Sequence, residues 1–261
     1  MKYNKNNESV NKYCAGLFDG DGSIFLGIDK DGYISISFEI CGDGRVPKVE
    51  ETLLFLHDHY DIGYISRRTN GMMTWHVGAD NAVSLFNRIK KHSVVKARHG
   101  ERLIELRRQY RQGRTISKET LKRFLRWSRQ STGSLKFKNH FNWAWLAGYI
   151  DSDGYVGYKQ EVYTGLRFGC NYKKDREALD LIARSTGRTY RYSERDGCIR
   201  LDIHMSKDTH ATAQKYLPRL LPHLRIKKWQ VEQLLNYVKT PKKSNDSWKK
   251  NFKHIAPAET K

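Results

Sequence analysis

One short pattern occurs twice in this chain, and the repeat limits what the chain can fold into. Residues 13–24 read Tyr-Cys-Ala-Gly-Leu-Phe-Asp-Gly-Asp-Gly-Ser-Ile, and residues 145–156 read Trp-Leu-Ala-Gly-Tyr-Ile-Asp-Ser-Asp-Gly-Tyr-Val. The offset of 132 residues is constant, and the Ala-Gly pair, both aspartates and the glycine after the second aspartate are identical. A repeat of this length indicates that a whole structural unit is duplicated.

The likeness continues downstream. Residues 93–106 resemble residues 224–237, with Lys96 aligned to Lys227. Lys96 follows Asp21 by 75 residues, and Lys227 follows Asp153 by 74. Nearly equal spacing across different loops predicts two equivalent halves related by a pseudo-twofold axis. We expect an N-terminal half over 1–112, a basic linker over 113–140, and a C-terminal half with a basic tail over 141–261.

Apolar periodicity and turn signals predict the same order of elements in each half. The predicted fold class is α+β, with two pseudo-symmetric αββαββα halves. Each half holds a four-stranded antiparallel, saddle-shaped sheet backed by helices, and the halves join at the two motif helices. A short helix capped by Ser117 is expected in the linker. The predicted helices are 8–20, 48–60, 81–90, 96–112, 141–152, 173–185, 207–217 and 226–239; the predicted strands are 23–29, 33–41, 63–68, 73–77, 155–160, 164–171, 188–194 and 198–204.

The charge balance points to a polyanionic partner. The chain has 261 residues with 48 Lys and Arg against 28 Asp and Glu, a net charge of +20. Nucleic acid is the leading candidate, and an anionic membrane surface is the other. No apolar run is long enough to span a bilayer, and the first residues have no secretory signal core, so no membrane partner and an intracellular location are expected. The spacing of the four cysteines fits neither a zinc site nor a disulfide framework, which predicts reduced thiols.

Small residues recur at four-residue spacing in both motifs, as Gly16 and Gly20 and as Gly148 and Ser152. Residues four apart share one helix face, so two such helices can pack closely and bring their ends together. Asp21 and Asp153 would then meet at two helix C-termini, where negative charge is unfavourable. A divalent cation bound by both carboxylates would relieve the repulsion, and Mg²⁺ suits oxygen ligands beside a phosphodiester.

Residues 14–22 and 146–154 are similar to the two signature motifs of the LAGLIDADG homing endonucleases, of the monomeric kind with both motifs in one chain. The departures are Cys14 and Tyr149, where the pattern has aliphatic residues. The resemblance implies a site-specific DNA endonuclease that makes a metal-dependent double-strand break with 3′ overhangs. The biological role it implies is intron homing. It implies that two or more Mg²⁺ ions are the cofactor. It also implies that Mn²⁺ can replace Mg²⁺ and that Ca²⁺ binds without supporting cleavage. It also implies that the protein is located in an organelle (chloroplast or mitochondrion) or in a microbial cytoplasm.

The resemblance further assigns roles to individual residues. Asp21 and Asp153 are the metal-binding acids. Independently of the resemblance, we expect Asp19 and Asp151 to be structural and to bond the backbone or cap the helix ends. The backbone carbonyls of Gly20 and Ser152 are additional metal ligands. Lys96 and Lys227 match a basic residue in a solvent pocket beside the site, against the plain alternative of solvated surface lysines. The water-ordering position falls on Asn171 in the second half and on Asp43 or Gly42 in the first.

Strand alternation selects the side chains that would face double-stranded DNA, because successive residues point to opposite faces. A two-stranded ribbon fits the major groove, and arginine reads guanine there. About half of such residues would contact phosphate or water instead. The halves differ at these positions, so the target should be asymmetric or loosely pseudo-palindromic. The predicted DNA contacts are Tyr33, Ser35, Ser37, Glu39, Ser66, Arg68, Thr74, His76, Lys159, Arg167, Tyr190, Tyr192, Arg200 and Asp202, with Lys136 and Lys138 of the linker along phosphates.

Two other functions remain open on the same scaffold. One is an RNA-binding intron maturase, which would add intron RNA as a partner. The other is a DNA-binding regulator that does not cut. Intact acids and lysines in both motifs favour cleavage, because binding alone needs neither.

Overall fold

The computed structural model describes part of the chain in detail. The described residues are 7–28, 33–110, 116–130, 142–159, 163–186, 191–193, 198–204 and 210–239. Both halves of the chain are represented in these ranges.

The N-terminal half contains four helices and four strands among the described residues, in the predicted order. They are α1 (Glu8–Asp21), β1 (Gly22–Ile28), β2 (Ile34–Asp43), α2 (Pro47–Tyr60), β3 (Tyr64–Arg67), β4 (Met72–Gly78), α3 (Ala79–Ile89) and α4 (Ala97–Tyr110). The helix α5 (Lys118–Gln130) follows in the linker. The C-terminal half repeats the order as α6 (Trp143–Ser152), β5 (Gly154–Lys159), β6 (Tyr163–Asn171), α7 (Tyr172–Thr186), β7 (Arg191–Ser193), β8 (Cys198–His204), α8 (His210–Leu220) and α9 (Lys228–Lys239).

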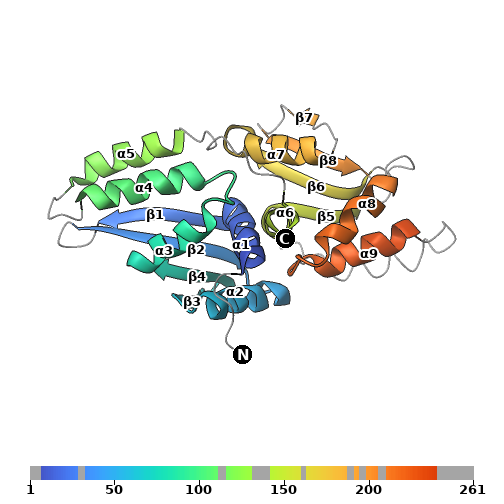
Figure 1. Ribbon diagram of the computed structural model, residues 1–261, viewed down its shortest axis with the longest axis horizontal. Coiled ribbons are helices and arrows are strands. Elements are labelled where there is room, and N and C mark those ends of the chain that lie inside the picture. The colour runs from blue at the N-terminus through green and yellow to red at the C-terminus, as the bar shows by residue number, and fades with distance from the viewer. Residues whose placement is uncertain are drawn as a thin grey trace.

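The two sheets have the same topology. The strand order is β1-β2-β4-β3 in one and β5-β6-β8-β7 in the other, and every described pair of strands is antiparallel. The halves lie side by side along the longest axis of the molecule, with α1 and α6 between them (Figure 1). The predicted α+β fold with two equivalent halves is confirmed.

The sheet of the first half has one buried face and one open face. Along β2, Ile36, Phe38 and Ile40 are buried, while Ser35 is exposed and Ser37 is half-buried. Helices α1–α4 all pack against this sheet. The alternation follows from the pleat, which sends successive side chains to opposite faces. The open face is therefore available to a partner.

The halves join where α1 packs on α6, as the small residues predict. A Cβ atom on Gly16 would overlap the carbonyl of Trp145, and a Cβ on Gly148 would overlap the carbonyl of Tyr13. A Cβ on Gly20 would overlap the side chain of Ser152. At Gly16 and Gly148 the two backbones approach each other so closely that only glycine fits.

The linker helix forms as expected. The Ser117 hydroxyl accepts a 3.1 Å hydrogen bond from the Thr120 N–H, and Leu121 is buried where α5 packs on α4. The described lysines and arginines of α5 are exposed: Lys118, Lys122, Arg123 and Arg126.

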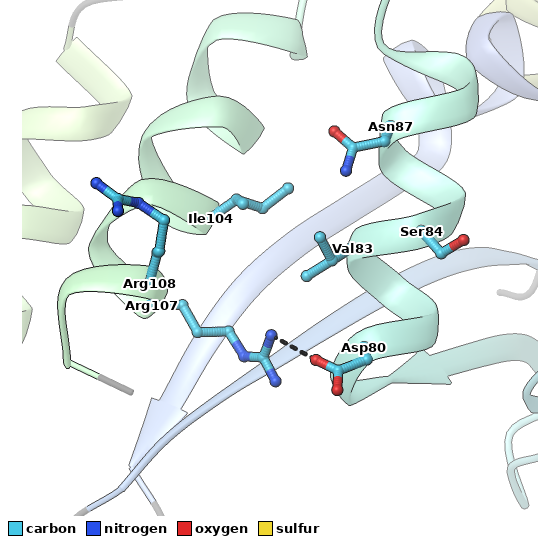
Figure 2. A pocket seen from close by; sticks show the side chains of 7 residues that line it. All are labelled: Asp80, Val83, Ser84, Asn87, Ile104, Arg107 and Arg108. Atoms are coloured by element: carbon cyan, nitrogen blue, oxygen red, sulfur yellow. Dashed lines mark hydrogen bonds and ion pairs between the residues drawn. The ribbon is translucent and has the colours of Figure 1, made fainter. Parts of the chain in front are cut away.

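A pocket of about 460 Å³ opens between α3 and α4 (Figure 2). Val83 and Ile104 give it apolar walls, and Arg107 donates a 2.9 Å hydrogen bond to Asp80 across one end. Neither motif aspartate lines it. Of the helices in the described part of the chain, none combines the length and the apolar character needed to cross a membrane.

Candidate functional site

Asp21 and Asp153 lie at matching ends of the two packed helices. Asp21 is the last residue of α1, and Asp153 is the residue directly after α6. Both keep exposed surface. Because α1 and α6 pack along their small faces, the two carboxylates are brought to one place, as the repeat predicts.

The electrostatics of this place disfavour a charged carboxylate. Partial burial, followed by the charge of Asp153, raises the pKa of Asp21 from 3.8 to about 6, while Lys227 and Lys96 lower it. Partial burial also raises the pKa of Asp153, against the lowering effect of the same two lysines. Two acids held in this state gain from any cation that joins them.

Lys96 caps the helix that carries Asp21. Its Nζ donates to the carbonyl oxygens of Phe18 at 2.9 Å, Gly20 at 2.6 Å and Gly22 at 2.7 Å. These carbonyls lie at the C-terminus of α1, where a helix carries partial negative charge. The lysine therefore fixes the end of the helix and places a positive charge beside the motif acids.

Lys227 makes the equivalent contacts in the second half. Its Nζ donates to Ile150 O at 2.7 Å, Ser152 O at 2.9 Å and Gly154 O at 2.6 Å. Desolvation lowers the pKa of this lysine, and the charges of Asp151, Asp21 and Asp153 oppose the shift. The alternative of a solvated surface lysine does not describe either residue, because each Nζ is held by three backbone oxygens.

Asp19 and Asp151 are buried acids that organise the backbone. Asp19 accepts hydrogen bonds from Ser93 Oγ at 2.5 Å, Val94 N at 2.6 Å and Lys96 N at 3.0 Å. These donors belong to the loop that leads into α4. The structural role expected for the first aspartate of each motif agrees with these bonds.

Asp151 repeats the arrangement with the loop before α9. It accepts from Arg225 N at 2.8 Å, Ile226 N at 3.1 Å and Lys227 N at 2.8 Å. Each buried aspartate thereby positions the lysine that caps its own motif helix.

Each buried aspartate also accepts one bond from the other half, a feature that sequence reasoning missed. Trp145 Nε1 donates to Asp19 at 2.9 Å, and Tyr13 Oη donates to Asp151 at 2.8 Å. The available signal was the pair of aromatic residues with a polar hydrogen at equivalent positions of the repeat. Such residues find a partner when they are buried.

The residues present fit a divalent metal ion with open coordination positions. Asp21 and Asp153 supply carboxylate oxygens, and the carbonyls of Gly20 and Ser152 are at the same helix ends. Each carbonyl already accepts one bond from a lysine but retains a second lone pair. Within the described ranges, no group of three or more His, Cys, Asp or Glu side chains is placed to hold a metal. An ion here would complete its shell with water and a bound phosphate, which is how Mg²⁺ is usually held.

Both candidates for the water-ordering position in the first half, Asp43 and Gly42, lie at the end of β2. Asp43 ends β2 and is paired with Arg45, whose Nη2 lies 2.7 Å and Nε 2.9 Å from its carboxylate. The Arg45 side-chain and backbone N–H bonds lower the pKa of Asp43. Gly42 faces Val49 of α2 beneath the sheet. Asn171 ends β6, with its Cα paired to that of Cys198, and its side chain lies outside the described residues.

Most of the predicted DNA contacts in the first half lie on the open face of the sheet. Tyr33, Ser35 and Arg68 are exposed, and Ser37, Glu39, Ser66 and His76 are partly exposed. Thr74 does not fit its expected role. It lies in the same row as Cys41 and Ser66 but is fully buried, with its hydroxyl 3.3 Å from Cys41 Sγ. Neighbouring side chains cover it, so alternation alone overestimates its access.

Three exposed residues of this face were missed. Ser23 and Phe25 alternate along β1, and Tyr64 begins β3. The register pairs Ser23 with Glu39 and Tyr64 with His76, which puts them on the open face. The alternation of β1 was the signal that could have found the first two.

In the second half, the register places the predicted contacts but their side chains lie outside the described residues. Arg167 is paired with Tyr155, which is exposed, and with Asp202. By the register, Lys159 and Arg200 lie on the same face of the sheet as these residues. Tyr192 is paired with Ile199, in line with the buried Val156 rather than with Tyr155. By its register, Tyr192 therefore falls on the face opposite to the open one on which it was expected. Tyr190, Lys136 and Lys138 are outside the described ranges.

Comparison with known proteins reveals the fold. No protein-family model matches the sequence, and no curated protein matches it. Solved structures do. A variant of I-SmaMI with two lysine-to-alanine substitutions has a TM-score of 0.70 at 12% identity, over 94% of this chain and 96% of that one. The LAGLIDADG meganuclease I-AabMI bound to uncleaved DNA has a TM-score of 0.64 at 14% identity, over 87% and 90%.

A third structure agrees with these two. The LAGLIDADG homing endonuclease I-GzeII in complex with its DNA target has a TM-score of 0.63 at 15% identity, over 94% of this chain and 92% of that one. Because the sequence identity to these structures is only 12–15%, the comparison establishes a shared fold. Over most of its length, the chain has the fold of the LAGLIDADG homing endonucleases.

Proposed function

We propose that this chain is a site-specific DNA endonuclease that cuts both strands of a long, asymmetric or pseudo-palindromic target and leaves 3′ overhangs. Its biological role would be intron homing, and it would act as a monomer because one chain holds both motifs. Two of the similar structures, I-AabMI and I-GzeII, are complexes with DNA, which supports a DNA partner.

The observation that carries the proposal is the meeting of Asp21 and Asp153 at the ends of α1 and α6. Burial raises the pKa of both acids and the charge of Asp153 adds to the shift at Asp21, so a cation bound between them would stabilise their ionised forms. DNA binding alone gives no reason to hold two acids together on a chain of net charge +20. A phosphodiester hydrolase does give one, because paired carboxylates can hold metal beside the scissile phosphate.

The proposed cofactor is Mg²⁺, with two or more ions, held by Asp21, Asp153 and the carbonyls of Gly20 and Ser152. When bound, such ions activate water and offset the charge that develops on the phosphate. Mn²⁺ should substitute, and Ca²⁺ should bind without supporting cleavage. A structure of I-SmaMI with uncleaved DNA in the presence of calcium ions agrees with this expectation for a protein of the same fold.

The two lysines contribute through charge rather than through a mobile donor. Each Nζ is occupied by three carbonyls, so its positive charge is fixed beside the acids. A fixed charge needs no reorganisation as the phosphate becomes more negative, which is the most effective form of electrostatic stabilisation. We therefore assign Lys96 and Lys227 to positioning and electrostatic support of the site.

The DNA would lie on the open faces of the two sheets. Each sheet would occupy a major groove, and the motif acids would lie over the minor groove between them, giving a footprint of about 20 base pairs at ~10 base pairs per turn. The exposed and partly exposed residues of the first sheet supply polar groups for this contact.

A cleavage selection tests the proposal. The purified chain is incubated with a randomised duplex library in Mg²⁺ and, separately, in Ca²⁺, and the ends are sequenced. Discrete double-strand cuts with 3′ overhangs in Mg²⁺ alone are expected from the native chain. Asp21→Asn and Asp153→Asn should bind the selected site and fail to cut it, whereas Asp58→Asn, an exposed acid of α2, should cut normally.

Other outcomes identify the alternatives. Binding to one DNA site with no cuts in any metal would indicate a regulator. Preference for a structured intron RNA over every DNA would indicate a maturase. Substantial cutting by Asp21→Asn would overturn the assignment of the metal site.

A further inference from the structure

Three side chains from three strands are joined by short hydrogen bonds on the open face of the first sheet. His76 on β4 lies with Nδ1 2.7 Å from Glu39 Oε1 on β2 and with Nε2 2.7 Å from Ser66 Oγ on β3. Tyr64 stacks on the imidazole, with ring centroids 5.0 Å apart and planes at 20°. The side chains of His76 and Glu39 are only 20% and 16% exposed, so the cluster is fixed before any partner arrives.

The chemistry of the three groups sets the direction of each bond. An ionised carboxylate only accepts, so Nδ1 of His76 carries a proton and donates it to Glu39. In the neutral imidazole, Nε2 is then an acceptor, and the Ser66 hydroxyl must donate to it. The hydroxyl hydrogen of Ser66 is therefore turned towards the ring and away from an incoming ligand.

What remains for a ligand is a set of acceptors. Glu39 has a second carboxylate oxygen, and Ser66 Oγ has lone pairs, while the donor of each hydrogen bond in the cluster is already used. A bare acceptor pair repels phosphate and the O6 and N7 atoms of guanine. It attracts the exocyclic amino groups of cytosine and adenine, which are the donors of the major groove.

The register locates the cluster along the target. Gly22, next to Asp21, is paired with Ile40, so Glu39 and His76 lie in the row of side chains that follows the motif acid. Ser66 lies in the adjacent row, nearer the end of the sheet where the motif acid sits. The cluster therefore faces the base pairs of the N-terminal half-site that are closest to the centre of the DNA.

We propose that Glu39 and Ser66, held by His76, make this half-site select the orientation of a base pair that places its amino group, N4 of cytosine or N6 of adenine, opposite these two acceptors in the major groove. Glu39 and Ser66 determine specificity, and His76 is a positioning residue that fixes the proton arrangement. This inference rests on the proposed function, because it requires DNA on the open face of the sheet.

The second half holds a different pair at the equivalent place. Gly154 is paired with Phe168 as Gly22 is with Ile40, so Arg167 and Asp202 take the register positions of Glu39 and His76. An arginine supplies donors where Glu39 supplies an acceptor, and arginine prefers guanine. The two half-sites should therefore differ in base identity at matching distances from the centre.

The test is a binding selection from a randomised duplex library in Ca²⁺. For the native chain, cytosine or adenine should be enriched at least about fivefold at one or two positions near the centre of one half-site. Glu39→Gln turns an amide N–H₂ outwards once its oxygen accepts from His76. Its selected sites should carry guanine or thymine there instead.

Two further variants separate positioning from simple weakening. His76→Phe preserves stacking on Tyr64 but frees the Ser66 hydroxyl to rotate, so the preference at one of these positions should broaden while the rest of the site is unchanged. A merely structural defect would weaken all sites alike and leave the ranking of bases intact. Glu51→Gln, an exposed glutamate on α2, removes the same charge and should leave the selected sites unchanged.

The outcomes distinguish the two levels of inference. If the native chain selects no DNA sequence, the proposed function fails. If it selects a sequence and Glu39→Gln selects the same bases at every position, the cluster does not read the DNA and this inference is overturned. Should Glu39→Gln not fold, Ser66→Ala replaces it, and an unchanged base preference in that variant has the same meaning.

Discussion

The indole Nε1–H of Trp145 donates a 2.9 Å hydrogen bond to the buried carboxylate of Asp19, which belongs to the other half of the chain. Tyr13 and Asp151 form the reciprocal bond at 2.8 Å. Asp19 also holds the backbone of Lys96, and Lys96 holds the end of α1. Each half thus supplies one group that completes the support of the motif end of the other half.

Trp145→Phe tests this connection. The substitution keeps most of the aromatic volume and removes the donor, leaving a buried carboxylate with one unmet lone pair. The free energy of unfolding should fall by about 2 kcal/mol, as for other hydrogen bonds to charged groups. Urea unfolding measures it. Trp143→Phe, two residues earlier at the start of α6, should cost clearly less; equal losses would contradict the proposed importance of the bond.

Lys227→Met should damage both stability and cleavage. The variant keeps the length of the side chain but leaves three carbonyl oxygens without their charged donor, at a cost of roughly 2–4 kcal/mol. The single-turnover rate on the selected site should fall more than affinity does, because the fixed charge beside the acids is lost. Lys228→Met is the matched control, since that lysine is exposed. An unchanged rate in Lys227→Met would remove this residue from the support of the site.

Gly16→Ala should separate the two halves or prevent folding. The added Cβ would overlap the carbonyl of Trp145, and backbone cannot move aside as a flexible side chain can. Overpacking of this kind costs about 1–3 kcal/mol or more. Gly78→Ala is the control, because nothing lies within 4 Å of its added Cβ. Thermal unfolding of the two variants should differ strongly, and similar melting temperatures would contradict the close packing of α1 on α6.

Asp21→Asn should stabilise the metal-free protein at neutral pH. The pKa of Asp21 is raised from 3.8 to about 6 in the folded state, so folding favours its protonated form. The stability it contributes is present below 3.8 and is lost as the pH rises through 6. At pH 7 the charged carboxylate is a net cost, which the amide removes, for a gain of roughly 1 kcal/mol after allowance for solvent screening.

Melting temperatures in EDTA and in Mg²⁺ measure this effect. The native chain should be stabilised by Mg²⁺ at pH 7 and much less at pH 5, where the acid is protonated before the ion binds. Asp21→Asn should melt higher than the native chain in EDTA and respond weakly to Mg²⁺. A full response to Mg²⁺ in that variant would show that the ion binds elsewhere.

The order of elements and the motif acids could be predicted from the sequence because both are recorded locally. The repeat aligns Asp21 with Asp153 and Lys96 with Lys227, and alternation along β2 identifies the open face of the sheet. Predicted boundaries agree with the observed helices and strands to within a few residues. Periodicity records which face of an element is buried, and that information is present in every window of sequence.

The contacts that join distant residues could not be predicted in this way. Nothing local shows that Lys96 would be held by three carbonyls or that Trp145 would reach Asp19. Thr74 lies on the open face of the sheet, as the alternation predicts, but its side chain is buried by its neighbours. Periodicity therefore predicted the face correctly and the exposure wrongly. Side-chain partners depend on how the elements pack, which a pattern within one element does not contain.

The fit between Gly20 and Ser152 has a consequence for the history of the two repeats. The serine side chain fills the space that a Cβ on Gly20 would need, so serine on one helix requires glycine on the other. Copying the second repeat over the first by gene conversion would place serine at both positions and force the helices apart. The two repeats therefore have to differ at this position for as long as Ser152 is kept, because a side chain at position 20 would overlap it.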